Sequence, residues 1–179
     1  MLKYFTATIV LLLVITGCQR DRDRNSNSSL INPRETKKQL EHVNKLLVEK
    51  DKEQIEAYIK RHQLVEMQEN KAGLFYLVWG DENGLQVETN DIVVLNYKIS
   101  LLDGTECYTT SAEKPKEFLV GKGGVESGLE MAVLLMKEGQ KGKFILPPHL
   151  GHGLIGDSDK IPPLAILVFD VELLEVIKS

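Results

Sequence analysis

The sequence predicts an α+β protein in which an antiparallel β-sheet wraps a short α-helix and follows an N-terminal helical segment. Apolar residues recur at helical spacing over about 34–61, and strand-like runs alternate with tight turns from Gly73 onward. One short helical stretch interrupts these strands at about 125–136. The 179 residues, 42% hydrophobic and 27% charged, exclude collagen-like, low-complexity and wholly disordered chains.

The start of the chain is typical of an export signal. Lys3 supplies an early positive charge, and a largely apolar run over 4–15 follows. This run is shorter than the about 20 residues that a spanning helix needs, but it fits a signal-peptide core. Residues 15–18 (ITGC) resemble the bacterial lipobox, in which cleavage precedes the cysteine and lipid is attached to its sulfur. We therefore predict a lipoprotein signal peptide over 1–17 and lipidation of Cys18.

Lipidation at this position predicts a chain anchored to a membrane of the bacterial cell envelope. The alternative is an ordinary signal peptide with an incidental cysteine. Residues 18–32 are alternately charged and rich in Ser and Asn, so they cannot bury apolar area. We predict that they form a flexible tether.

A helical segment is expected over 33–72. Pro33 suits the first turn of a helix, and apolar positions spaced by three and four residues predict an amphipathic helix over about 34–49. Asp51 is expected to cap a second helix, with Gln54 in the capping-box position. The apolar positions of the two helices are Leu40, Val43 and Leu47, then Ile55, Tyr58, Ile59 and His62.

Two short helices bury little apolar area by themselves, so these stripes must pack on something else. Over 33–71 the chain has nine basic and eight acidic residues, and the charged faces are interpreted as solvated surface. We expect the segment to cap the main domain. The alternative is an arm that forms a homodimer or holds client chains.

Residues 73–179 are predicted to form the sheet and its helix. Strands are expected at about 74–79, 91–99, 143–146 and 164–176. The helix is expected from the spacing of Val125, Leu129, Ala132 and Met136, and Gly139 is placed to end it. This region has nine basic and sixteen acidic residues, which disfavours a nucleic-acid partner.

The most specific motif lies in the last predicted strand. Residues 161–174 (IPPLAILVFDVELL) resemble the C-terminal strand of FKBP-type peptidyl-prolyl cis/trans isomerases and the Ile-Pro-Pro turn before it. Further motifs follow in the order of that family: VLNY at 94–97, LDG at 102–104, FLVGK at 118–122, GLE at 128–130, MKEGQ at 136–140, and LP at 146–147 through GHG at 151–153.

The resemblance covers about 73–177 and implies a bent, FKBP-like antiparallel sheet of five or six strands around a short helix. It implies an isomerase domain over 73–179. With its lipobox and helices, the chain is also similar to the gliding-motility-associated isomerase lipoproteins of gliding bacteria.

The resemblance further implies an enzyme that assists the folding of exported, proline-containing polypeptides with no cofactor. Rotation about an Xaa-Pro bond faces about 18–20 kcal/mol, and an apolar pocket that strips water from the carbonyl favours the twisted geometry. The family's pocket lining carries over to Tyr97, Val125, Ile161 and Phe169.

Other positions of the implied pocket depart from the family pattern. Cys107 stands where an aromatic residue is usual, Tyr108 where an Asp is usual, Leu129 where a Trp is common, and His152 where a Tyr is common. Glu126 replaces an apolar residue whose backbone amide contacts substrate. Loss of ring area at Leu129 widens the floor, and Tyr108 is expected to fill part of that space.

These departures leave two functions open. The first is a working isomerase with weak or selective turnover, and the second is a peptide-binding, chaperone-like lipoprotein that keeps only the fold. His149 and His152 have a spacing that can bind metal on a helix, but their Pro- and Gly-rich surroundings predict a loop, so no metal site is expected. We interpret Cys107 as a small buried hydrophobe rather than a catalytic thiol.

Overall fold

The computed structural model describes residues 32–111 and 113–179. The predicted signal peptide, Cys18 and the tether up to residue 31 lie outside these residues. The contacts between residues divide the chain into two units at Leu40, and Glu41–Ser179 forms one compact unit. Among the residues that the structure describes, no helix combines the length and apolar character that a membrane span requires.

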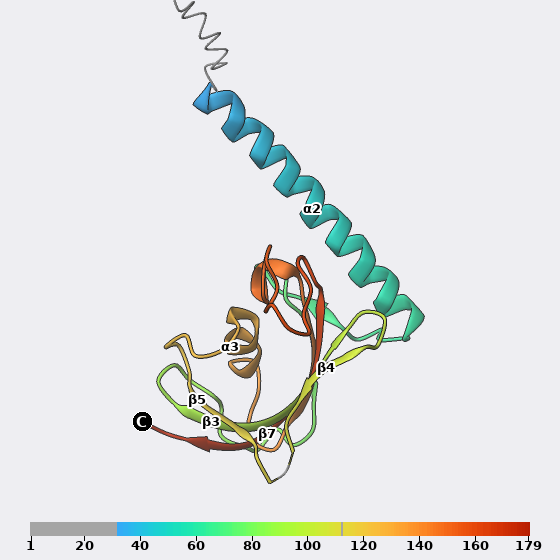
Figure 1. The fold of residues 1–179 in the computed structure, drawn as a ribbon. Helices are drawn as coiled ribbons and strands as arrows, with labels where there is room; N and C mark the ends of the chain where they lie inside the picture. Colours follow the sequence, from blue (N-terminus) through green and yellow to red (C-terminus); the bar gives the residue numbers. More distant parts are fainter. Residues whose placement is uncertain (1–31, 112) are drawn as a thin grey trace, which may run out of the picture. The chain divides into compact units, whose positions relative to one another are not determined.

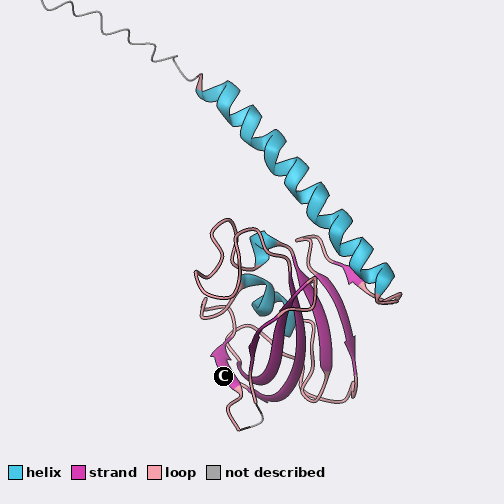
Figure 2. Ribbon diagram, turned by 45° about the vertical axis from the view of Figure 1, so that its right-hand side comes forward, coloured by secondary structure: helices cyan, strands magenta, loops and turns pink. Residues whose placement is uncertain are grey.

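The strands of the described residues form one seven-stranded antiparallel sheet that curves around a short helix (Figures 1 and 2). The strands are β1 (Gln68–Glu69), β2 (Phe75–Trp79), β3 (Ile92–Leu101), β4 (Glu106–Thr109), β5 (Lys116–Leu119), β6 (Lys141–Leu146) and β7 (Leu167–Ile177). Their order is β1-β2-β6-β7-β3-β4, and β5 pairs with the first half of β3. The α+β class and the FKBP-like sheet are thereby confirmed.

The sheet has one strand more than the resemblance implied. The additional strand, β1, has two residues that pair with Phe75 and Tyr76 of β2, and it lies before the region that the resemblance covers. The last strand begins at Leu167 rather than at Leu164, because Leu164 has a left-handed φ of 58° that a strand does not accommodate. The segment before β7 is therefore a turn.

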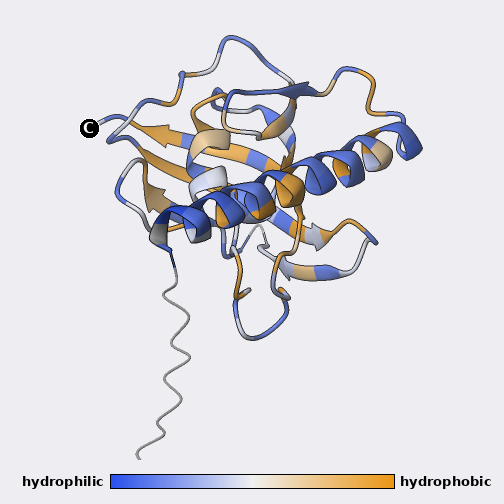
Figure 3. Ribbon diagram, turned by 90° about the horizontal axis from the view of Figure 1, so that it is seen from above, coloured by the Kyte–Doolittle hydropathy of each residue, from blue (hydrophilic) through white to orange (hydrophobic). Residues whose placement is uncertain are grey.

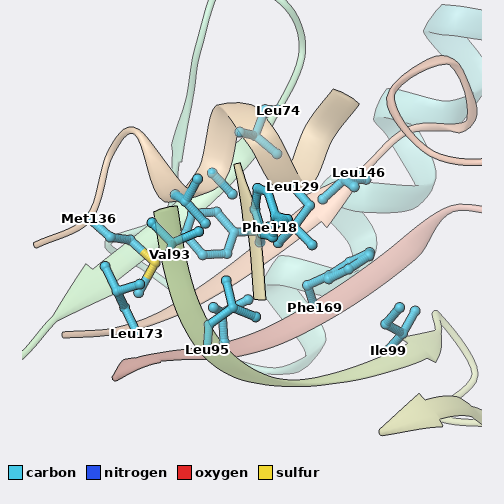
Figure 4. Close-up of a cluster of buried hydrophobic side chains, with 14 of the residues drawn as sticks. Leu74, Val93, Leu95, Ile99, Phe118, Leu129, Met136, Leu146, Phe169 and Leu173 are labelled. Carbon is cyan, nitrogen blue, oxygen red and sulfur yellow. The ribbon is translucent and has the colours of Figure 1, made fainter. Parts of the chain in front are cut away.

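The concave face of the sheet carries the main core. Successive strand residues point to opposite faces, so Phe144 and Phe169 point inward while their neighbours Ile145 and Val168 point outward. Figure 4 shows Leu129 and Phe169 among the apolar side chains between the helix and the sheet. Most of these side chains are fully buried, so the core leaves little room for a change of volume.

The helix of this core, α3 (Ser127–Val133), is shorter than predicted. Leu129 and Ala132 lie on its buried face as expected, but Met136 follows in tight turns, where its amide bonds to the Val133 carbonyl at 2.9 Å. Gly139 does not end the helix as predicted; it has a φ of 80° in the next turn. Close packing also fixes Gly128, because a Cβ there would lie 2.5 Å from a Leu146 methyl.

The two predicted N-terminal helices are a single helix, α2 (Pro33–Arg61), so the prediction that Asp51 starts a second helix is wrong. No glycine or proline lies between 49 and 54, and a break there would leave backbone groups at two new helix ends without partners. Asp51 is partly buried instead, which raises its pKa, and the nearby His149 opposes this rise. Residues after Arg61 form turns and β1, so the helical segment does not extend to residue 72.

Within the compact unit, the C-terminal half of α2 packs on the outer face of the sheet. Ile55 and Tyr58 are buried against Phe75, Ile145 and Val168, so this half of the helix is a cap. The helix ends in a Schellman arrangement in which the Leu64 amide bonds to the Ile59 carbonyl at 3.0 Å.

The first half of α2 has a different surface. Leu40 and Val43, part of the predicted apolar stripe, are 59% and 50% exposed. Figure 3 shows hydrophobic residues alternating with hydrophilic ones along the helix. The stripe is therefore continuous in sequence but buried only in its C-terminal part.

Candidate functional site

An open cleft of about 450 Å³ lies beside α3 and is the candidate site. It is bounded by β3, the start of β5, the segment before α3 and the loop after the 3₁₀ helix η1 (Pro148–Leu150). The residues that line it are Tyr97, Lys116, Gly123, Gly124, Val125, Glu126, Leu129, Gly151 and His152. The cleft thus brings together residues that are far apart in the sequence.

Several sequence-predicted residues line this cleft directly. Tyr97 comes from β3, Val125 and Glu126 precede α3, Leu129 lies on α3, and His152 lies on the loop after η1. Glu126 is extended, with φ −58° and ψ 139°, which starts the helix at Ser127. These residues place apolar and aromatic side chains next to one acidic and one imidazole side chain.

The aromatic part of the site continues below the cleft. The rings of Tyr97 and Phe169 lie with their centroids 6.1 Å apart and their planes tilted by 52°, within the range of favourable aromatic pairs. Phe169 is fully buried and Ile161 is 2% exposed, so both support the lining from within the core. Burial raises the pKa of the Tyr97 hydroxyl, and the charge of Glu126 adds to this effect.

Glu126 and His152 form a contact across the cleft. The His152 Nε2 atom lies 3.0 Å from Glu126 Oε1, and both side chains are largely buried. The contact joins the loop after η1 to the segment before α3. The floor is consequently apolar and aromatic, whereas this wall is polar.

Tyr108 has polar partners that the sequence interpretation did not include. Its hydroxyl donates to the Asp157 carboxylate and lies 3.2 Å from the Asp159 carboxylate, so the loop holds its polar end. The Lys160 ammonium lies 5.1 Å from the centre of the Tyr108 ring, a cation–π contact. Hydrogen bonding to Asp157 raises the pKa of Tyr108.

Asp157 organises the loop that leads into the Ile-Pro-Pro turn. Its Oδ1 accepts the backbone amides of Asp159 and Ile161 at 2.9 and 2.8 Å. The hydrogen bond from the Tyr108 hydroxyl, with these two amide bonds, lowers the pKa of Asp157 to about 2. The loop that carries Ile161 is therefore held by an ionised carboxylate.

Cys107 is buried beneath the same loop. It is 2% exposed, and its Sγ lies 3.7 Å from the Lys160 carbonyl oxygen, a weak contact. Burial raises the pKa of the thiol, and the charge of Asp157 acts in the same direction. A thiol held protonated in this way is a poor nucleophile.

The two histidines have different positions and partners: His149 lies in η1 rather than in the predicted loop, and His152 lies in the loop after it. His149 Nε2 lies 3.0 Å from the Ala72 carbonyl, whereas His152 meets Glu126. Within residues 32–111 and 113–179, no group of three or more His, Cys, Asp or Glu side chains is arranged to hold a metal ion.

The sequence interpretation missed some residues of the site. Lys116, Gly123, Gly124 and Gly151 line the cleft, and Asp157 holds the adjoining loop. A signal for the last of these was present, because the Asp-Ser-Asp-Lys run directly before Ile-Pro-Pro is typical of an Asx turn. The glycines and the lysine have no comparable local signal.

Comparison with known proteins places this arrangement in a family. Residues 84–174 match the family model of the FKBP-type peptidyl-prolyl cis-trans isomerases. The chain belongs to this family. FK506-binding protein 2 of Dictyostelium discoideum is 39% identical over 98 residues, which cover 54% of the chain and 73% of that protein.

Longer FKBP relatives are matched only in part. Mouse peptidyl-prolyl cis-trans isomerase FKBP9 is 41% identical over 90 residues, covering 50% of the chain but only 16% of that protein. The crystal structure of FkpA from Escherichia coli superposes with a TM-score of 0.63 at 26% identity, covering 99% of this chain and 82% of FkpA. AtFKBP13 gives a TM-score of 0.58 at 25% identity, covering 62% of this chain and 98% of that one.

Proposed function

We propose that the chain is a peptidyl-prolyl cis-trans isomerase that acts on proline-containing polypeptides in the cleft beside α3. The observation that carries the proposal is the floor of this cleft, where Tyr97 lies against the buried ring of Phe169 within an FKBP fold. Val125 and Leu129 add apolar surface, and Ile161 supports the floor from within the core. Such a surface suits a prolyl ring.

The proposed catalysis is non-covalent. The barrier of about 18–20 kcal/mol arises because the imide C–N bond has partial double-bond character. An apolar floor favours the twisted bond, in which this resonance is lost, by removing water from the substrate carbonyl and holding the ring in place. The protonated thiol of Cys107 is consistent with a site that needs no nucleophile.

Exchange NMR on short Xaa-Pro peptides, with the full-length protein purified in detergent, tests this proposal. We expect cis–trans exchange to be faster than the uncatalysed rate, which corresponds to tens of seconds or more at 25 °C. Exchange at the uncatalysed rate across a range of Xaa residues would contradict the enzyme assignment.

A peptide-binding protein without turnover is the second candidate. It is favoured by the polar wall, because the Glu126–His152 contact and the tyrosine at 108 are unusual in a pocket that should be dry. In that case the same peptides bind while their exchange rate stays uncatalysed. The exchange experiment therefore separates the two candidates.

Export and anchoring are part of the proposal. We propose a signal peptide over 1–17, a lipid on Cys18, a tether over 18–32, an N-terminal segment over 33–72 that contains α2, and an isomerase domain over 73–179. The lipobox-like residues 15–18 support an envelope lipoprotein similar to the gliding-motility-associated isomerases, and we propose that its clients are exported chains. Labelled palmitate should enter the wild-type protein but not Cys18→Ala; label in that variant would contradict the anchor.

A homodimer through α2 remains a proposal supported by exposed apolar side chains. Leu40, Val43, Leu46 and Val48 leave half or more of their surface exposed. Sedimentation analysis of the full-length protein and of a Val43→Glu variant tests it. A monomer in both cases would argue against dimerisation.

A further inference from the structure

The wall of the cleft carries a carboxylate that its own helix does not use. Glu126 occupies the N-cap position of α3, where a short polar side chain such as Ser or Asp commonly accepts a backbone amide of the first turn. Here the side chain makes no such bond. It lines the cleft instead and meets His152. The position of its charge is therefore set by the cleft rather than by capping.

This carboxylate retains capacity to bind a further donor. His152 contacts Oε1, and in the described part of the chain Oε2 accepts no hydrogen bond. An ionised carboxylate offers about four acceptor positions over its two oxygens. A substrate ammonium or guanidinium group can thus bind Glu126 without displacing the imidazole.

The charge of Glu126 acts where a prolyl ring would lie. It adds to the rise in the pKa of Tyr97, so its field reaches the aromatic floor. A basic residue next to a proline on that floor could extend its methylenes along Val125 and place its charged end at Glu126.

The other charged groups at the cleft partly offset one another. Lys116 lines it as well, and the Glu130 carboxylate accepts the amide of Gly123 at its rim, 2.9 Å away. Asp157 lies close enough to His152 for their charges to interact. Lys160, which lies over the Tyr108 ring, offsets Asp157, so the charge that a substrate side chain beside Val125 meets is that of Glu126. An acidic substrate residue is repelled there and a basic one is attracted.

We propose that Glu126 makes this cleft selective for peptides that carry Lys or Arg next to the proline. The inference deepens the proposed function, because it assigns a substrate class to the same cleft. Glu126 acts as a specificity residue that contacts the substrate side chain. A single carboxylate in a site that is open to water gives a modest preference, about 3- to 5-fold.

Peptide affinity measures this preference separately from turnover. Labelled peptides with a single proline and with Lys, Gln or Glu on either side of it are titrated with the full-length protein in detergent, and binding is followed by fluorescence anisotropy. We expect the Lys peptide to bind about 3- to 5-fold more tightly than the Gln peptide in one of the two series, and the Glu peptide to bind most weakly. The difference should shrink at high salt.

Two variants show whether the preference comes from Glu126. Glu126→Gln keeps the size of the side chain and should bring the Lys-to-Gln affinity ratio to about 1. Glu117→Gln makes the same change in net charge at an exposed position of β5 outside the cleft lining, and it should leave the ratio unchanged.

Equal affinities for the Lys and Glu peptides in the wild type, or no measurable binding, would overturn the charge selection. So would a Lys preference that survives in Glu126→Gln. Parallel exchange NMR on the Gln peptide distinguishes the failures. Accelerated exchange with equal affinities overturns the selection alone, whereas charge-selective binding without acceleration overturns the isomerase function alone.

Discussion

The two faces of the sheet are built from neighbouring residues of the same strands, yet they serve different purposes. On β7, Phe169 points to the concave face and supports the cleft, whereas Val168 points to the outer face and packs beneath α2. The concave face couples stability to the site, because its core is also the floor of the cleft. The outer face holds the C-terminal half of α2, and in the described part of the chain its apolar cluster includes none of the residues that line the cleft.

The largest expected effect comes from comparing substitutions of two neighbouring β7 residues that point to opposite faces of the sheet. Phe169→Ala should lower the free energy of unfolding by about 3–5 kcal/mol and abolish acceleration of exchange, since it removes the ring beneath Tyr97. Val168→Ala should lower it by only about 2 kcal/mol and keep the acceleration per folded molecule. Urea unfolding and exchange NMR measure both effects.

Phe169→Leu provides a folded variant if the alanine variant does not fold. It should keep most of the stability and lose most of the acceleration, because an aliphatic side chain cannot replace the ring contact. Unchanged acceleration in a folded variant at this position would place the site elsewhere.

The second prediction concerns the outer face and α2. Ile55 is 1% exposed, so Ile55→Ala should lower the free energy of unfolding by about 2–4 kcal/mol. Leu46→Ala, on the exposed part of the same helix, should change it by less than about 0.5 kcal/mol. Exchange catalysis per folded molecule should be unaffected in both. A loss of catalysis in folded Ile55→Ala would show that the faces are coupled.

The third prediction concerns packing at α3. Gly128→Ala gains helix propensity, but the new Cβ would meet Leu146 and the Leu150 carbonyl oxygen, 2.9 Å away. We expect a net loss of about 1–2 kcal/mol in urea unfolding, because overpacking outweighs propensity. Gly124→Ala, where a Cβ would meet nothing within 4 Å, is the control and should be nearly neutral. A stabilised Gly128→Ala would mean that the core rearranges easily.

The smallest effect is the dependence of stability on acid. The pKa of Asp157 is lowered to about 2 in the folded protein, so its contribution is present above its unfolded pKa of about 3.9 and is lost as the pH falls toward 2. Wild-type stability should therefore fall more steeply between pH 4 and pH 2 than that of Asp157→Asn. Equal slopes in acid-dependent urea unfolding would show that this carboxylate does not hold the loop.

The fold was predictable from the sequence because two clear patterns fall on paired strands. The apolar run at 91–99 covers most of β3, and the motif at 161–174 covers most of β7 and the turn before it. The continuity of α2 through Asp51 was not predictable, since a capping residue and an ordinary helix position look alike when no glycine or proline decides between them. Likewise, apolar spacing located α3 but not its ends, because Met136 is buried by the core through a turn rather than through the helix.

Most residues that line the cleft were predictable, whereas the hydrogen bonds that hold the adjoining loop were not. The resemblance to a known fold allowed five lining residues to be predicted: Tyr97, Val125, Glu126, Leu129 and His152. The Tyr108–Asp157 contact joins β4 to a loop 49 residues later, and nothing in the local sequence of either residue specifies the other. Tertiary packing decides such contacts.

The position of β7 has a consequence for how the protein folds. Although it is the last strand of the chain, β7 lies between β6 and β3 and pairs with both. The longest partner of β7, strand β3, therefore pairs along its whole length with a segment much later in the sequence, and pairing over such a separation is slow. The cleft is complete only when β7 has paired, because Phe169 of β7 lies beside Tyr97; until then the apolar faces of the earlier strands are uncovered and prone to aggregation.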